Sequence, residues 1–204
     1  MENPDKDILF QAAEAWMELT QYRYLFTYGY KKKLNTITLV FTPSDFHHAA
    51  GFQYMKDISA LRYSPGKLLL KILDGTIDTA SFLCAAQFEN CVLPRLHAIL
   101  RLKASLDSEF TLFKFIPQYG HLYTNIKADY LISSHVDHTD FIFIIKSDSN
   151  SVSTEYTCCS IFEEGSRNFE EKQSPRTLLK KERIHIASNQ TDILYNRLAA
   201  TSEE

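Results

Sequence analysis

Two adjacent histidines stand directly after a signal for the start of a helix. The signal is Thr42-Pro43-Ser44-Asp45, and the segment that follows it is Phe46-His47-His48-Ala49-Ala50-Gly51-Phe52. Histidine is the side chain best suited to take up or release a proton near neutral pH, so His48 is a candidate general acid or base. Gly51 costs roughly 1 kcal/mol relative to alanine inside a helix, which indicates that another group packs closely there. The alternative is that these histidines only pack and form hydrogen bonds.

A second candidate is the cation of Arg95, which follows Pro94 in a long helical stretch with one apolar face. A guanidinium can hold a phosphate through two parallel hydrogen bonds, so Arg95 could bind a phosphate group in a cleft. The alternative is an ordinary ion pair at the surface. We expect Pro94 to kink or split the helix, because proline lacks an amide hydrogen and its ring clashes with the preceding turn.

Other chemistries lack their residue patterns in this sequence. The chain contains no HExxH, no GxSxG and no glycine-rich phosphate loop, and it has only 6 glycines. His135 and His138 stand close together, but in an expected turn and without a glutamate at helical spacing. We therefore expect no bound metal ion and no cofactor. The four cysteines lack zinc-site spacing and are expected to be reduced thiols of the core.

The composition limits the class of protein. The chain has 204 residues and a formal net charge of −3 at pH 7. Non-specific coating of nucleic acid requires an excess of Lys and Arg, so the net charge of −3 argues against such coating. A local basic cleft is still compatible with this net charge. The first residues lack the pattern of a signal peptide, and no apolar run is long enough to cross a bilayer. We expect a cytoplasmic protein without membrane contact.

The periodicity of apolar residues predicts the fold class. Residues 5–107 are expected to be mainly helical, apart from a β-branched strand at residues 34–41. Successive strands are expected in residues 108–187, with a short helix beginning at Ser174-Pro175, and residues 188–204 are expected to form a tail. The prediction is a single α+β domain, in which a helical N-terminal half packs on a roughly four-stranded antiparallel sheet in the C-terminal half.

Several motifs, taken in order, resemble a known family. They are Ile37-Thr38-Leu39-Val40-Phe41 leading into the histidine segment, Arg95-Leu96 with Leu100, Ile126-Lys127-Ala128-Asp129-Tyr130, Tyr156 with Ser160-Ile161-Phe162, and Phe169 with Gln173 and Leu178-Leu179-Lys180-Lys181. From about residue 20 to residue 187, the chain resembles the phage-associated members of the barnase/EndoU/colicin/RelE-like nuclease superfamily, in the branch usually numbered fourth. Two departures are visible. Ala49-Ala50 replaces a bulkier pair, and Phe169 stands where tyrosine is more usual, which removes a hydroxyl that could contact substrate.

The resemblance implies a metal-independent nuclease that cleaves RNA and is encoded by a phage or a mobile element. Attack of a ribose 2′-hydroxyl on the adjacent phosphate needs a base for that hydroxyl, an acid for the leaving 5′-oxygen and cations for the negative charge that develops on the oxygens of the phosphorane. By residue type, His48 is the candidate base or acid, Arg95 the phosphate clamp and Lys180 a second cation. Ser160 and Gln173 are candidate hydrogen-bond donors to the phosphate or to a base.

Two other functions compete with RNA cleavage. The first is a non-catalytic descendant that binds RNA or a protein, favoured by the acidic net charge and by Phe169. The second is a small-molecule-binding domain, suggested by the 14 Phe and 11 Tyr residues. RNA is the expected partner, an inhibitory protein such as an antitoxin or immunity protein is a second candidate partner, and the oligomeric state stays open.

Overall fold

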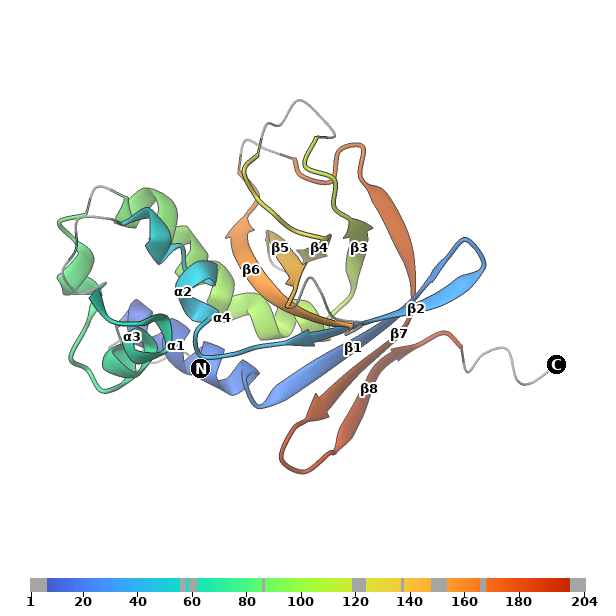
Figure 1. Cartoon of the computed structure of the whole chain (residues 1–204), viewed down its shortest axis with the longest axis horizontal. Helices are drawn as coiled ribbons and strands as arrows, with labels where there is room; N and C mark the ends of the chain where they lie inside the picture. The colour runs from blue at the N-terminus through green and yellow to red at the C-terminus, as the bar shows by residue number, and fades with distance from the viewer. Residues whose placement is uncertain are drawn as a thin grey trace.

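The strands of the protein form one β-sheet that closes on itself as a barrel (Figure 1). The computed structural model describes residues 7–55, 58, 62–85, 87–118, 124–136, 138–147, 154–165 and 168–198. Its strands are β1 (Tyr22–Tyr30), β2 (Lys33–Val40), β3 (Phe110–Lys114), β4 (Tyr130–His135), β5 (Thr139–Lys146), β6 (Glu155–Glu163), β7 (Ser174–His185) and β8 (Thr191–Asn196). Their order is β1-β2-β6-β5-β4-β3-β7-β8, and β1 also pairs with β7. Strands β1 to β7 therefore close the barrel, and β8 is added to β7.

The pairings explain how distant parts of the chain share one sheet. Strands β1 and β2 form an antiparallel hairpin whose two turn residues, Lys31 and Lys32, have φ angles of 49° and 61°. Left-handed backbone at both positions is the usual geometry of a two-residue hairpin turn. Strand β2 then pairs in parallel with β6. A parallel pair needs a long crossover connection, and every described helix except the first one of the chain lies in that connection.

The helices lie together on one side of the barrel (Figure 1). They are α1 (Ile8–Leu19), α2 (Phe46–Ala49), the 3-10 turns η1 (Phe52–Tyr54) and η3 (Thr79–Phe82), α3 (Pro65–Leu73), the π-helical turn η4 (Phe88–Val92) and α4 (Leu93–Asp107). Pro94 stands in the first turn of α4, where its missing amide hydrogen costs no helical bond. The expected split of the helix at Pro94 is therefore confirmed. None of the described helices has both the length and the apolar character needed to span a membrane.

The predicted fold class is wrong: the protein is not a helical half packed on a four-stranded antiparallel sheet. The N-terminal half contributes β1 and β2 to the barrel, and residues 174–185, which were expected to begin with a helix, form the long strand β7. Strand β8 lies within residues 188–204. In β1, buried side chains alternate with less buried ones, as expected for a strand with one face in the core. The partner that makes β1 stable, β7, lies more than a hundred residues further along the chain, so no local pattern indicates this pairing.

Strand β5 has buried side chains on both of its faces, and this arrangement creates two apolar clusters. Ile142 and Ile144 belong to the larger core, which the barrel shares with α1 and α4. Phe141 and Phe143 belong to a smaller cluster on the opposite face, together with Phe169. The sequence of a strand that is covered on both faces is a continuous run of apolar residues. The smaller cluster forms one wall of a pocket.

Candidate functional site

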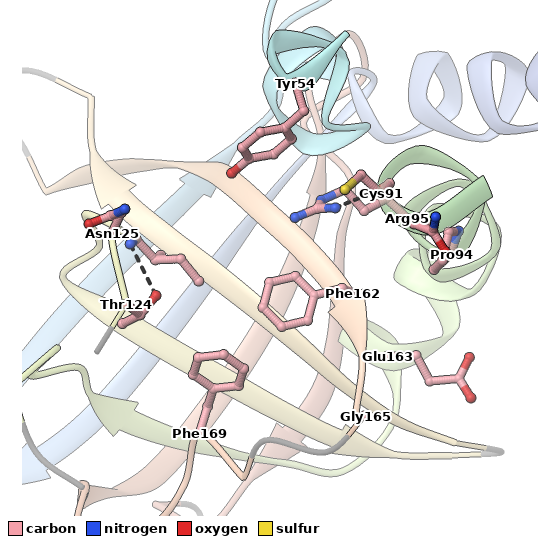
Figure 2. Close-up of a pocket in the computed structure, with 12 residues that line it drawn as sticks. Tyr54, Cys91, Pro94, Arg95, Thr124, Asn125, Phe162, Glu163, Gly165 and Phe169 are labelled. Carbon is pink, nitrogen blue, oxygen red and sulfur yellow. Dashed lines mark hydrogen bonds between the residues drawn. The ribbon is translucent and has the colours of Figure 1, made fainter. Parts of the chain in front are cut away.

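A pocket of about 670 Å³ lies where the start of α4 approaches the end of β6 (Figure 2). Four separate parts of the chain line it. These are Tyr54 of η1, residues of the 90–95 segment, residues 124–126, and residues of the 162–169 segment. The lining combines aromatic rings, amide side chains, one arginine and one glutamate, which suits a ligand with both flat and charged parts.

Arg95 is held between two aromatic rings of the pocket. Its guanidinium carbon is 5.2 Å from the ring centre of Tyr54 and 5.3 Å from that of Phe162. Nη1 of the guanidinium donates a hydrogen bond to the carbonyl of Cys91, one turn earlier in the chain. A cation within about 6 Å of an aromatic ring face is attracted to it, so both rings help to fix the guanidinium. Figure 2 shows the guanidinium reaching from α4 toward the pocket between Tyr54 and Phe162.

The charge of Arg95 has no carboxylate partner among the described residues. No ion pair found there includes Arg95, and its Nε is buried without a hydrogen-bond partner. Burial lowers the pKa of the guanidinium from its usual range, while Tyr54 and Cys91 act in the opposite direction. A partly buried cation without a counter-charge is unfavourable, and a buried Nε without an acceptor adds to that cost. An anion entering the pocket would supply the missing charge and an acceptor for Nε.

Gly51 lies against Arg95. Its φ angle is 81°, and a β-carbon there would stand 2.9 Å from Cδ of Arg95 and 3.2 Å from Nε. The prediction that a group packs closely on Gly51 is confirmed, and that group is the candidate phosphate-binding side chain. The glycine lies between α2 and η1, so it also allows the turn that brings Tyr54 to the pocket.

His48 and Ser160 do not line this pocket. His48 lies in α2 and is exposed, with its ring 5.4 Å from the ring of His47. Ser160 is buried in β6, opposite Phe143 of β5. The structure therefore does not bring His48 and Ser160 together with Arg95 in one cavity.

Gln173 and Lys180 also lie away from the pocket and have partners of their own. The side-chain amide of Gln173 donates to the carbonyl of Ile116 at 3.0 Å, and its oxygen accepts from the Ile116 amide at 2.8 Å. Lys180 pairs with Glu182 on the same strand, with 2.7 Å between Nζ and Oε1. Among the five residues predicted from the sequence, only Arg95 lines the pocket.

Other lining residues were not predicted as site residues. Tyr54 and Asn125 carried no signal in the sequence, because neither belongs to a motif: Tyr54 ends the 3-10 turn η1, and Asn125 lies in the segment before β4. Phe162 and Phe169 appeared only as motif positions, yet their rings lie 5.3 Å apart and form the aromatic wall of the pocket (Figure 2). Phe169 is therefore at the pocket, where the absence of a tyrosine hydroxyl affects the lining directly. Among the described residues, no group of three or more His, Cys, Asp or Glu is placed to hold a metal ion.

Comparison with protein families places this barrel in a class of nucleases. Residues 8–198 match the family described as phage-Barnase-EndoU-ColicinE5/D-RelE like nuclease4. This match spans almost the whole chain, so the chain belongs to that family, as the motifs indicated. No curated protein and no solved structure matches the chain.

Proposed function

We propose that this protein cleaves RNA without a metal ion, by attack of a ribose 2′-hydroxyl on the adjacent phosphate, and that Arg95 holds this phosphate in the pocket. The observation that carries the proposal is the guanidinium of Arg95, which lies in the pocket between Tyr54 and Phe162 without a carboxylate partner among the described residues. Membership of a phage-type nuclease family supports cleavage of a phosphodiester as the activity.

The lining of the pocket suits a single-stranded ribonucleotide. A guanidinium binds phosphate through paired hydrogen bonds, and its charge stabilises the negative charge that builds up in the transition state. Aromatic faces such as Phe162 and Phe169 accept unpaired bases by stacking, at about 1–3 kcal/mol per base. The side chains of Asn90 and Asn125 add hydrogen-bonding groups to the same lining.

Several roles predicted from the sequence stay predictions. His48 as acid or base, Ser160 and Gln173 as donors, and Lys180 as a second cation would each require a substrate that extends beyond the pocket. An inhibitory protein partner likewise stays a prediction. Phosphate binding by Arg95 is the one predicted role that the position of the side chain in a pocket supports.

A cleavage assay in EDTA tests the proposal. We expect the parent chain to cleave single-stranded RNA and to leave 2′,3′-cyclic phosphate and 5′-hydroxyl ends. Arg95→Ala is expected to abolish cleavage. Arg95→Lys is expected to retain only part of the parental activity, because an ammonium group cannot form two parallel hydrogen bonds to the phosphate. Arg197→Ala serves as the matched control, because Arg197 is exposed and does not line the pocket. Cleavage that requires a divalent ion, or that survives in folded Arg95→Ala, would contradict the proposal.

A non-catalytic RNA- or protein-binding module is the second candidate. It is favoured by Phe169, which brings no hydroxyl to the lining, and by the net charge of −3. If the folded parent chain cleaves none of several RNAs, fluorescence anisotropy with labelled RNA should follow. Binding that Arg95→Ala weakens would then assign the pocket to recognition without catalysis.

A further inference from the structure

The inner face of the barrel becomes polar near the end at which β1 turns into β2. Along β1, Tyr24 and Phe26 belong to the buried core, and Tyr28 is the next residue in the same alternating row. The hydroxyl of Tyr28 lies 2.7 Å from the hydroxyl of Tyr130 on β4. Tyr130 stands opposite Lys114 in the β3–β4 pair, and Nζ of Lys114 lies 4.6 Å from the ring centre of Tyr130. Polar groups from three strands therefore converge at this end of the barrel.

Arg176 of β7 and Lys31 of the β1–β2 turn bring positive charge to the same place. The guanidinium carbon of Arg176 lies 3.9 Å from the ring centre of Tyr30, and Nζ of Lys31 lies 5.3 Å from the same ring centre. Burial raises the pKa of Tyr28 and of Tyr130 above the usual value, while the nearby charge of Arg176 acts in the opposite direction. Both hydroxyls therefore stay protonated at neutral pH, and the guanidinium is close enough to act on both.

This cluster has more positive charge and more hydrogen-bond donors than its described residues balance. The carboxylate that they place there, Asp129, lies 3.2 Å from Nζ of Lys114 and accepts from the amide of Lys146 at 3.0 Å. Neither Arg176 nor Lys31 forms an ion pair within the part of the chain that the structure describes, and Arg176 donates only to the carbonyl of Pro175 at 3.4 Å. In a pair of hydroxyls only one hydrogen lies between the two oxygens, so the second is available to another acceptor. An anion would satisfy both the charge and the donors.

We propose that this end of the barrel binds a phosphate monoester, the group that ends a mononucleotide or a 5′-phosphorylated RNA. Such a group carries about two negative charges at neutral pH, which match the unpaired charges of Arg176 and Lys31. A guanidinium and protonated hydroxyls are suitable donors to its oxygens. Tyr28 is 5 % exposed and Tyr30 is 42 % exposed, so the hydroxyl pair lies deeper than the outer ring. A terminal phosphate can reach these deeper groups, whereas a phosphate within a strand carries a nucleotide on each side.

This phosphate site is separate from the pocket that holds Arg95. Tyr28, Tyr130 and Arg176 are not among the residues that line that pocket. The aromatic wall of the pocket, Phe162 and Phe169, packs in the smaller cluster, whereas Tyr28 and Tyr130 pack in the larger core on the opposite face of β5. The inference therefore goes beyond RNA cleavage and does not depend on it.

Titration calorimetry with adenosine 5′-monophosphate, and with adenosine as the ligand that lacks phosphate, tests the proposal. We expect the monophosphate to bind and adenosine not to bind. Arg176→Gln and Lys31→Asn are each expected to weaken binding about 10–100-fold, because each removes a charged donor. Asparagine tolerates the φ angle of 49° at position 31. Tyr130→Phe removes only a hydroxyl and should weaken binding about tenfold or less. Arg23→Gln is the matched control, because Arg23 is exposed on the other face of β1, and Arg95→Ala should also bind as the parent chain does.

A second titration distinguishes the two sources of the phosphate. It uses a short 2′-O-methylated RNA, which has no 2′-hydroxyl to attack, with either a 5′-phosphate or a 5′-hydroxyl end. Binding that needs both the 5′-phosphate and Arg176 assigns the site to RNA ends, and binding of the monophosphate alone assigns it to free nucleotides. The proposal is overturned if no phosphate-bearing ligand binds, if adenosine binds as tightly as its monophosphate, or if binding is lost in Arg95→Ala. Parental affinity in folded Arg176→Gln also overturns it. Should Arg176→Gln fail to fold, Lys31→Asn decides, because Lys31 lies in an exposed turn.

Discussion

Gly51 and Arg95 are in direct contact across two elements that lie far apart in the sequence. A β-carbon on Gly51 would stand 2.9 Å from Cδ of Arg95, closer than real β-carbons approach other heavy atoms. The contact places the arginine stem against the turn between α2 and η1, and the guanidinium then reaches the rings of Tyr54 and Phe162. The glycine is thus part of the site, although it has no side chain.

Gly51→Ala is expected to affect both stability and the pocket. The φ angle of 81° is unfavourable for alanine, and the new methyl group must displace Arg95, so we expect a loss of about 1–3 kcal/mol in the free energy of unfolding. RNA binding should weaken as well. Gly66→Ala is the control, because a β-carbon on Gly66 has no atom within 4 Å. Urea denaturation and fluorescence anisotropy check both effects, and equal stability of the two variants would contradict the prediction.

Lys181→Met is expected to destabilise the barrel. Lys181 is only 2 % exposed, and its Nζ donates to the carbonyls of Asp107 and Ser108 at the end of α4. Removing the donor leaves two carbonyls without this partner, which we expect to cost about 1–3 kcal/mol of the free energy of unfolding. Lys180→Met is the matched control, since the partner of Lys180 among the described residues is Glu182 on the same strand. Urea denaturation of both variants at pH 7 measures the difference.

The same lysine predicts a pH dependence of stability. Burial lowers the pKa of Lys181 from 10.5 to about 8 in the folded protein, and Asp107 and Glu109 act in the opposite direction. Between these two values the unfolded state binds more protons than the folded state, so the contribution of Lys181 to stability rises with pH. The difference in free energy of unfolding between the parent chain and Lys181→Met should therefore grow from pH 8 to pH 10. A constant difference across this range would rule out the lowered pKa.

His47 predicts a second pH dependence, on the acidic side. Burial lowers the pKa of His47 from 6.5, the nearby His48 lowers it further, and Nδ1 of His47 is buried without a hydrogen-bond partner. As pH falls toward 6.5, His47 takes up a proton in the unfolded protein, whereas in the folded protein it does so only at lower pH. Acidification therefore favours the unfolded state and reduces the free energy of unfolding. His47→Gln is expected to flatten this decline, and His48→Gln to reduce it only slightly. Thermal unfolding at pH 7.5 and pH 5.5 tests this, and parallel declines in all three proteins would disprove it.

The pair of Arg101 and Asp140 is expected to be important for stability. Arg101→Met leaves the nearly fully buried carboxylate of Asp140 without its partner, which we expect to cost about 3–5 kcal/mol. Arg101→Met combined with Asp140→Leu should recover much of the loss, because no buried charge then remains unpaired. The control is Lys103→Met, because its carboxylate partners Glu18 and Asp107 are partly exposed, and each such pair is worth about 1 kcal/mol or less. Urea denaturation of the parent chain, the single and double variants at Arg101 and Asp140, and Lys103→Met measures these differences in the free energy of unfolding. An equal loss in Arg101→Met and Lys103→Met would contradict the prediction.

One N-terminal strand and the break at Pro94 could be predicted from local patterns. A strand was expected at residues 34–41, and β2 spans Lys33–Val40. Pro94 divides the helical stretch as predicted, because the cost of an internal proline depends only on its own backbone. The strands β1, β7 and β8 could not be predicted in this way. The pairing of β1 with β7 joins distant segments of the chain, and β8 in turn depends on its pairing with β7.

The candidate site also combines features that local sequence indicates with features that depend on the tertiary structure. The sequence by itself indicated Arg95 as a candidate for phosphate binding, a close neighbour for Gly51, and a resemblance of the chain to a phage-type nuclease family. Only the tertiary structure decided that Arg95 lies between Tyr54 and Phe162, that Glu163 lines the same pocket, and that Lys181 rather than Lys180 is the buried lysine. The physical reason is that residue type and spacing report local preferences, whereas strand register and barrel closure decide which side chains converge.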